Sequence, residues 1–362
     1  MNMEKIKWQA IQLRDVLKIG NGKDYKHLQK GDVPVYGTGG VMTYVNDYLY
    51  DGETVCIGRK GTIDKPIYHI GKIWTVDTLF YTHSFVGVVP HFLYYEFCNI
   101  NWNKYNEATG VPSLSKETIY KIDIPIPVTS SGKPSLPTQR RIVEILSSVD
   151  KVIDSTEALI KKYKAIKMGL LDDLLQPKEG WQKTTLGKIG KISMCKRIFS
   201  FETTSSGDIP FYKIGTFGKK ADAFISKQLY EEYKSKFSYP KVGDILISAS
   251  GTIGRTVVYD GKPAYFQDSN IIWIDNDEKV VLNQFLLYLY KTITWNLEGS
   301  TIARLYNDNF NRIEISYPDY AEQQRISLVL QSVDAKITSE QKTLEKYRNL
   351  KKGLMKDLFK GK

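Results

Sequence analysis

The sequence has little of what builds a disulfide framework or a zinc site. Its 362 residues include three cysteines, Cys56, Cys98 and Cys195, and no CxxC pair. Both kinds of site need several cysteines or histidines at short, characteristic spacings. We therefore interpret the three cysteines as packing residues of the interior and expect no metal in this chain.

Long apolar runs are also absent. No stretch of about 18 apolar residues could span a bilayer, and the N-terminus MNMEKIKWQA lacks the apolar core of a signal peptide. We expect a cytoplasmic protein without membrane attachment. With 42% hydrophobic and 25% charged residues the composition is typical of globular proteins, and the length favours two domains or a few.

The common motifs of catalysis are missing as well. There is no GxxxxGK[ST], HExxH or GxGxxG, and no Asn-Pro-Pro-Tyr or Asp-Pro-Pro-Tyr of the kind that holds a flipped adenine. Asp77 and Asp268 lie at equivalent positions of a repeat described below, but without a partner acid we interpret both as structural. The first half holds every histidine, at positions 27, 69, 83 and 91. We predict a protein that performs no catalysis, the alternative being a stand-alone methyltransferase or nuclease.

What the chain does contain is a repeat. RIVEILSSVDKVI begins at Arg141 and RISLVLQSVDAKI begins at Arg325. Further pairs follow in the same order along both halves, among them DVPVY with DIPFY, FLYYEFCNINW with FLLYLYKTITW, and KYKAIKMGLLDDLL with KYRNLKKGLMKDLF. Self-similarity over such a length indicates duplication of one structural unit.

Each copy has about 130 residues of short β-branched runs bounded by Gly, Asp and Pro, followed by a long helical pattern. This predicts an α+β fold with four segments. They are a first strand-rich head (1–136), a central long helix (137–178), a second head (179–319) and a C-terminal long helix (320–362).

The two helical patterns predict a coiled coil. Apolar residues or Tyr alternate at steps of four and three, as in a heptad seam. We expect the copies to pair antiparallel, with Lys167 near Glu340 and Lys351 near Thr156, rather than each burying its stripe on its own head. A helix from Thr138 to Leu175 would be about 57 Å long and could set the spacing between two readers of DNA. The seam residues are Ile142, Leu146, Val149, Ile153, Ile160, Tyr163, Leu170, Leu174, Ile326, Leu330, Val333, Ile337, Leu344, Tyr347, Leu354 and Leu358.

The chain resembles the DNA specificity subunits of type I restriction-modification systems over nearly its whole length. The residues that carry the resemblance are VPVYGTGG from Val33, IGRKGTID from Ile57, LSKETIYKIDIPIP from Leu114 and QRRIVEILSSVD from Gln139, with their second copies. The resemblance implies two target recognition domains that each read one half of an asymmetric, bipartite sequence in double-stranded DNA. It also implies that the helices bind two methyltransferase subunits, which carry the methyl donor S-adenosylmethionine, and that restriction subunits join the full complex.

The net charge of +11 agrees with a polyanionic partner. One group of candidate DNA contacts lies in loops where the two copies diverge, since a shared scaffold with different loops is what two readers of different half-sites need. A second group lies at the glycine-rich turns, where glycines let the backbone approach a ligand closely and neighbouring residues supply charge. A solvated loop is the alternative for each residue, and a plain strand-to-strand turn for the glycine-rich segment near Gly61 and Gly251. The candidates are Lys23, Tyr25, Lys26, Lys30, Tyr36, Thr38, Arg59, Lys60, Lys196, Arg197, Lys213, Lys219, Lys220, Ser250, Thr252, Arg255 and Arg304.

The charge is unevenly divided between the halves. Residues 1–176 hold 22 basic and 19 acidic residues, and the rest hold 29 and 21. We therefore expect the second head to bind the DNA backbone more tightly than the first. The rival to DNA recognition is a duplicated scaffold whose coiled coil joins other proteins and whose charge is incidental.

Overall fold

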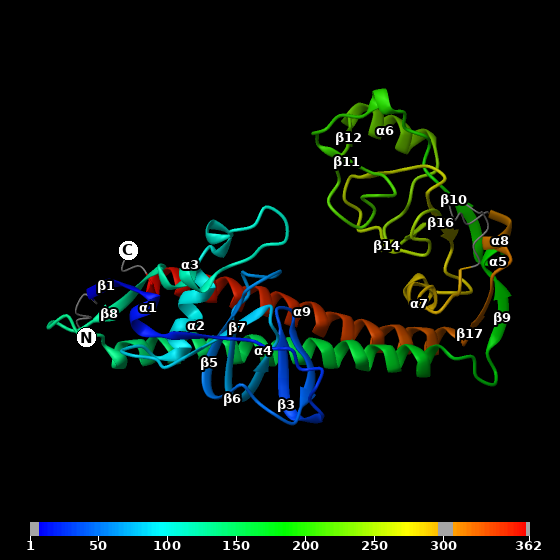
Figure 1. Ribbon diagram of the computed structural model, residues 1–362. Coiled ribbons are helices and arrows are strands. Elements are labelled where there is room, and N and C mark those ends of the chain that lie inside the picture. Colours follow the sequence, from blue (N-terminus) through cyan, green and yellow to red (C-terminus); the bar gives the residue numbers. More distant parts are fainter. Residues whose placement is uncertain (1–6, 296–306, 360–362) are drawn as a thin grey trace. The chain divides into compact units, whose positions relative to one another are not determined.

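The computed structural model describes residues 7–295 and 307–359 and divides the chain into two compact units (Figure 1). Unit 1 comprises residues 1–158 and 341–362, and unit 2 comprises residues 159–340. Each unit thus combines one head with one part of each long helix. Over the described residues, no helix is both long and apolar enough to cross a membrane.

The head of unit 1 is built on a six-stranded sheet in the order β2-β7-β5-β6-β3-β4. All neighbours are antiparallel except β3 and β6, which pair in parallel. The strands are β2 (Lys18–Asn21), β3 (Lys30–Gly37), β4 (Gly40–Val45), β5 (Tyr50–Gly58), β6 (Ile67–Thr75) and β7 (Leu79–His83). A separate antiparallel pair joins β1 (Lys7–Gln12) to β8 (Asp123–Val128). The prolines of β8 are tolerated because a two-stranded sheet has only edge strands.

The helices of this head pack between the sheets and the long helices. They are α1 (Leu13–Val16), α2 (Pro90–Asn99), the 3-10 turn Trp102–Tyr105 and α3 (Lys116–Tyr120). Phe92, Phe97 and Trp102 are almost fully buried and form one core with Ile142 and Leu146 of the central long helix. Burial of such large side chains supplies most of the stabilisation that holds a head on a helix.

Unit 2 repeats the plan with shorter strands. Its sheets have the orders β10-β16-β13-β14, β12-β11-β15 and β17-β9. The strands are β9 (Gln182–Thr185), β10 (Gly190–Ser193), β11 (Ile209–Tyr212), β12 (Phe224–Ile225), β13 (Ile245–Ser248), β14 (Thr256–Val258), β15 (Tyr265–Phe266), β16 (Ile271–Asn276) and β17 (Glu314–Tyr317). The helices are α5 (Leu186–Ile189), the 3-10 turn Ser200–Glu202, α6 (Lys227–Lys236), α7 (Asn283–Leu289) and α8 (Asn307–Asn311).

The two long helices are α4 (Leu136–Leu175, 40 residues) and α9 (Tyr320–Leu358, 39 residues). At 1.5 Å per residue, α4 is about 60 Å long. In unit 1 the start of α4 shares a core with Leu354 and Leu358 of α9, and in unit 2 the end of α4 shares a core with Ile326 and Leu330. The helices are therefore antiparallel, as predicted. Every position of the predicted seam is buried or half-buried.

The charges across the seam pair differently from our prediction. Lys167 forms its ion pair with Asp334, not with Glu340, and Lys351 lies 2.6 Å from Asp150 rather than against Thr156. Asp150 and Asp334 lie beside the seam, within reach of a lysine on the facing helix. The prediction considered only residues at seam positions and therefore did not include them. Opposite charges are still paired in both units.

The duplication extends to individual hydrogen bonds. In unit 1, Gln139 accepts from the Val89 amide (2.8 Å) and donates to the Gly87 carbonyl (3.1 Å). In unit 2, Gln323 accepts from the Leu282 amide (2.8 Å) and donates to the Val280 carbonyl (3.0 Å). The predicted repeat is thus also a repeat of buried polar contacts.

One prediction about the cysteines is wrong. Cys56 and Cys195 are buried, but Cys98 is exposed and so is not a packing residue of the interior. It lies near the end of α2, where the helix face turns away from the core. The apolar residues that surround Cys98 in the sequence had led us to predict that it is buried.

Candidate nucleic-acid interface

Three of the predicted segments of unit 1 meet at residues 75–78, which connect β6 to β7. The Lys23 amide donates to the Thr75 carbonyl (2.8 Å), the Val76 amide donates to the Tyr36 carbonyl (3.0 Å), and the Arg59 amide donates to the Thr78 carbonyl (2.8 Å). The loop after β2, the β3–β4 hairpin and the turn after β5 therefore lie side by side, although they are far apart in the sequence.

The basic side chains of these segments face solvent. Lys23, Lys26, Lys30, Arg59 and Lys60 are exposed. None of them forms an ion pair with any residue that the structure describes. Such cations are available to a phosphate backbone.

The two aromatic candidates of unit 1 serve the fold at least in part. Tyr25 is half-buried against the core cluster of Val35 and Trp74. The Tyr36 hydroxyl lies 3.4 Å from His69 Nδ1, and the two rings pack edge to face. Thr38 is half-buried at the turn of the hairpin, close to Gly61.

The glycine-rich turn of unit 1 connects the antiparallel strands β5 and β6. In its connectivity it is therefore a strand-to-strand turn. Gly58 is required by close approach, because a Cβ there would lie 2.1 Å from the Thr62 carbonyl oxygen. The turn is also supported from outside, since the Gly61 amide donates to the Pro112 carbonyl (2.8 Å) and the Leu114 amide donates to the Arg59 carbonyl (2.9 Å). These contacts hold Arg59 and Lys60 in fixed positions at the surface.

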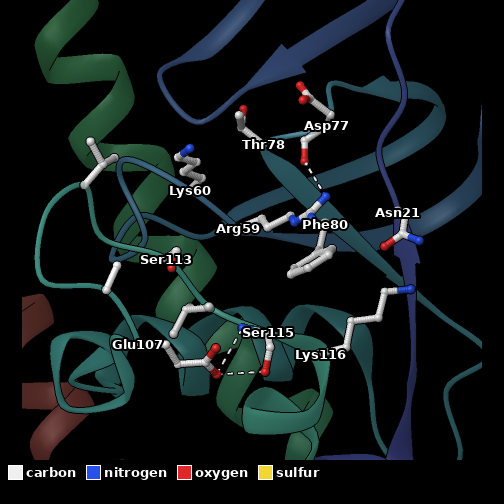
Figure 2. Close-up of a pocket in the computed structure, with 13 residues that line it drawn as sticks. Asn21, Arg59, Lys60, Asp77, Thr78, Phe80, Glu107, Ser113, Ser115 and Lys116 are labelled. Carbon is white, nitrogen blue, oxygen red and sulfur yellow. Dashed lines mark hydrogen bonds between the residues drawn. The ribbon is translucent and has the colours of Figure 1, made fainter.

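Behind this turn lies a cleft of about 900 Å³, shown in Figure 2. Arg59 and Lys116 both contact the ring of Phe80, with the guanidinium carbon 5.7 Å and the Lys116 Nζ 5.8 Å from its centroid. Lys116 Nζ also donates to the Ile19 carbonyl (2.7 Å). Desolvation, and then the charge of Arg59, lowers the pKa of Lys116 from its usual value.

The opposite wall of the cleft carries Glu107, whose charge is stabilised by local donors. Its Oε1 accepts from the hydroxyl of Thr118 and from the hydroxyl (2.7 Å) and amide (3.3 Å) of Ser115. These hydrogen bonds, the one from Thr118 foremost, lower the pKa of Glu107. Lys116 and Asn21 both line the cleft, and neither was among the predicted residues. Comparing the two copies could have identified Lys116, because LSKET has a lysine where LYNDN has Asn307.

Unit 2 brings the corresponding segments together in the same way. The Gln267 amide donates to the Tyr212 carbonyl (3.0 Å), which matches the bond from Val76 to Tyr36 in unit 1. Arg255 Nη1 donates to the Phe217 carbonyl (2.9 Å), and the Ile214 amide donates to Gln267 Oε1 (2.9 Å). Arg255 is thus half-buried and holds the loop at 213–220 against the turn at 249–255.

The charges of unit 2 are more often neutralised. Arg197 forms an ion pair with Asp268 (2.8 Å) and Lys213 with Asp222 (2.9 Å). Lys196 lies over the Phe237 ring at 5.1 Å, while Lys219 and Lys220 are exposed.

The remaining candidates of unit 2 differ in their exposure. Ser250 is buried, and its hydroxyl donates to Asn270 Oδ1 (2.7 Å), so it does not present a group to a ligand. Thr252 is exposed at the same turn. Arg304 lies outside the described residues.

An exposed apolar tip was also missed. Val41 and Met42, at the start of β4, are 47% and 57% exposed, beside the turn that contains Thr38. Apolar side chains on a β-ribbon can contact thymine methyl groups in the major groove. Neither residue was predicted, because the candidates chosen from the sequence were basic, polar or aromatic.

The chain is similar to a known family along both halves. A family model described as the type I restriction modification DNA specificity domain matches residues 5–165 and 178–347. A putative type I restriction enzyme specificity subunit of Haemophilus influenzae is 41% identical over 345 residues, covering 88% of each chain. The MjaVIII specificity subunit of Methanocaldococcus jannaschii is 26% identical over 352 residues, covering 87% of this chain and 78% of that protein.

Two solved structures share the fold. A type I restriction-modification S subunit from M. genitalium has a TM-score of 0.72 at 15% identity, covering 99% of this chain and 98% of the other. A chain from a study of complex assembly and conformational transition of a type I R-M system has a TM-score of 0.56 at 15% identity, covering 99% of both chains.

Proposed function

The chain belongs to the type I restriction-modification DNA specificity family, and from this membership we propose that its two heads bind the two halves of one bipartite, asymmetric DNA sequence. The family consists of specificity subunits, so the chain is a recognition component rather than a catalyst. Its task is to select the DNA on which other subunits act.

The observation that carries this proposal is a shared framework with different surfaces. The two units repeat the same backbone contacts, including those from Val76 to Tyr36 and from Gln267 to Tyr212. At equivalent positions of the glycine-rich turn, however, unit 1 has Arg59 and Lys60 where unit 2 has Ala249 and Ser250. Two readers that share a framework but differ at the surface fit a sequence whose halves are unlike.

The partners follow from the same family membership. We propose that the antiparallel pair of α4 and α9 binds two methyltransferase subunits and sets the gap between the half-sites. S-adenosylmethionine would bind to those subunits and not to this chain. Restriction subunits would complete the complex, which would act on DNA in the cytoplasm.

The test is to co-express the chain with the methyltransferase subunit encoded beside it and to map methylated adenines across the host genome. We expect one split motif with two unlike halves and a fixed gap. Random or absent methylation by a properly assembled complex would favour a coiled-coil scaffold without DNA specificity. A chain that cuts DNA or binds the methyl donor by itself would overturn its assignment as a recognition component.

A further inference from the structure

We propose that the cleft behind the glycine-rich turn of unit 1 clamps one phosphate of the DNA backbone between Arg59 and Lys116, a pair of cations that the second head does not repeat at the equivalent positions. The inference rests on the proposed function for the source of the phosphate. It goes beyond that function by naming the residues, and it opposes the expectation from net charge that the second head grips the backbone harder.

The first step is the close placement of two positive charges. Arg59 follows β5 and Lys116 begins α3, yet both cations lie within 6 Å of the Phe80 centroid (Figure 2). Like charges held this close repel each other, and the ring compensates for only part of that repulsion. An anion between them would stabilise both.

The second step is that no described carboxylate pairs with either cation, although those of Asp77 and Glu107 also line the cleft. Among the described residues, neither Arg59 nor Lys116 forms an ion pair. Arg59 Nη1 reaches the main-chain carbonyl of Asp77 (3.3 Å). Glu107 instead accepts hydrogen bonds from Ser115 and Thr118 through its Oε1. Arg59 and Lys116 thus each donate to a main-chain carbonyl, and neither is paired with a carboxylate.

The third step is the chemistry of the surroundings. The cleft is also lined by Asn21, Lys60, Thr78 and Ser113, which carry hydrogen-bond donors. A phosphate in DNA accepts hydrogen bonds from just such a mixture of guanidinium, ammonium, amide and hydroxyl groups. Lys60, which is exposed, adds a third cation to the lining.

The fourth step is the comparison with the second copy. The positions equivalent to Arg59, Phe80 and Lys116 hold Ala249, Ile272 and Asn307. At these three positions the second head therefore has neither cation and no aromatic ring. Its larger formal charge is partly neutralised by pairs such as Arg197 with Asp268 and Lys213 with Asp222. Net charge is thus a poor guide to which head grips phosphate.

The experiment measures binding of a 40-base-pair duplex of random sequence by the full chain assembled with its methyltransferase subunit, across a series of salt concentrations. The variant R59Q/K116Q is compared with K7Q/K133Q, which removes the same charge from exposed sites at the β1–β8 sheet. R59K/K116R keeps both charges. Thermal melting of each variant checks that it is folded.

We expect R59Q/K116Q to lower the slope of log K against log salt by about 0.9, the value for one lost phosphate contact. The ratio of methylation at the recognised motif to methylation at other sequences should stay unchanged, because contacts to phosphates carry no sequence information. The control pair and R59K/K116R should keep the slope of the unmodified chain.

Three outcomes would overturn the clamp. If R59Q/K116Q keeps the slope of the control, the cleft holds no backbone phosphate, although the proposed function stands. If the unmodified complex does not bind duplex DNA at low salt, both the clamp and the proposed function fail. If R59Q/K116Q loses binding of adenosine monophosphate but keeps that of the duplex, the cleft serves a free nucleotide.

Discussion

The hydroxyl of Tyr95 donates a hydrogen bond to Asp150 over 2.8 Å, and this contact ties the first head to the coiled coil. Asp150 on α4 also pairs with Lys351 on α9, and Lys351 lies over the Tyr95 ring at 5.4 Å. Desolvation and this hydrogen bond raise the pKa of Tyr95. One carboxylate thus joins three elements of unit 1.

The same arrangement occurs in unit 2. The Tyr288 hydroxyl donates to Asp334 over 3.0 Å, Asp334 pairs with Lys167, and Lys167 lies over the Tyr288 ring at 5.6 Å. The aspartate lies on α4 in unit 1 and on α9 in unit 2, and the lysine lies on the other helix in each case. In both units this contact links the head to the pairing of the two long helices.

The first prediction concerns Asp150. D150N keeps an acceptor for Tyr95 but leaves Lys351 half-buried without its ion pair, so the free energy of unfolding should fall by about 1–3 kcal/mol. Urea unfolding of the full chain measures it. D154N, an exposed site one turn further along α4, should change the stability by much less. Equal effects of the two substitutions would mean that the contact contributes nothing specific.

The second prediction concerns the buried glutamine. Gln139 is buried, and Q139L would leave the half-buried Val89 amide and Gly87 carbonyl without their partner, which should lower the free energy of unfolding by about 1–3 kcal/mol. The matched control is Q341L, because Gln341 is exposed on α9. Thermal melting with far-UV circular dichroism compares them. A melting temperature of Q139L equal to that of Q341L would contradict the role assigned to Gln139.

The third prediction is a pH dependence in unit 2. Desolvation, and then the neighbouring charge of Lys167, lowers the pKa of Lys291 from 10.5 to about 8. Protonated Lys291 therefore destabilises the fold below about pH 8, and this destabilisation disappears as the pH rises towards 10.5. K291M should be more stable than the unmodified chain at pH 7, and the difference should vanish near pH 10.5.

Urea unfolding at several pH values between 7 and 10.5 measures that difference. K161M, which removes an exposed lysine of α4 in the same unit, is the control and should show no such convergence. If K291M is as stable as K161M at every pH, Lys291 does not oppose folding.

The fourth prediction concerns Met42. M42S should leave thermal stability unchanged because the side chain is 57% exposed, but it should weaken discrimination at one base pair of the recognised sequence by about 1 kcal/mol or more, through loss of an apolar base contact. Methylation mapping of the assembled complex would show a relaxed position in one half-site. V86S changes an apolar residue that is 66% exposed in the segment between β7 and α2, and it should leave the motif intact. An unchanged motif in M42S would remove the hairpin tip from the proposed interface.

The architecture could be predicted from the sequence because it depends on periodicity. The duplication, the two long helices and their antiparallel pairing follow from apolar spacing that repeats, and burial of Ile142 and Ile326 at equivalent sites agrees with it. The ion pairs could not be predicted in the same way. Asp150 and Asp334 lie outside the heptad seam, and only the packed helices bring them to Lys351 and Lys167.

The candidate site was predictable only in part. Arg59 and Lys60 were found because they supply charge at a glycine-rich turn, whereas Ser250, chosen at the equivalent turn of the second copy, is buried. Met42 was missed because an apolar residue in a strand is usually interpreted as core. The placement of Lys116 beside Arg59 joins segments 57 residues apart, a distance over which local patterns carry no information.

The sequence by itself determined that the chain is one plan written twice, with strand-rich heads, heptad helices and divergent loops, because local periodicity and composition specify secondary structure and its repetition. Only the tertiary structure decided which charges are neutralised and which stay exposed without an ion pair. That depends on side chains from distant strands and loops meeting at one surface, where a neighbouring carboxylate or ring a few ångströms away changes what a lysine or arginine can bind.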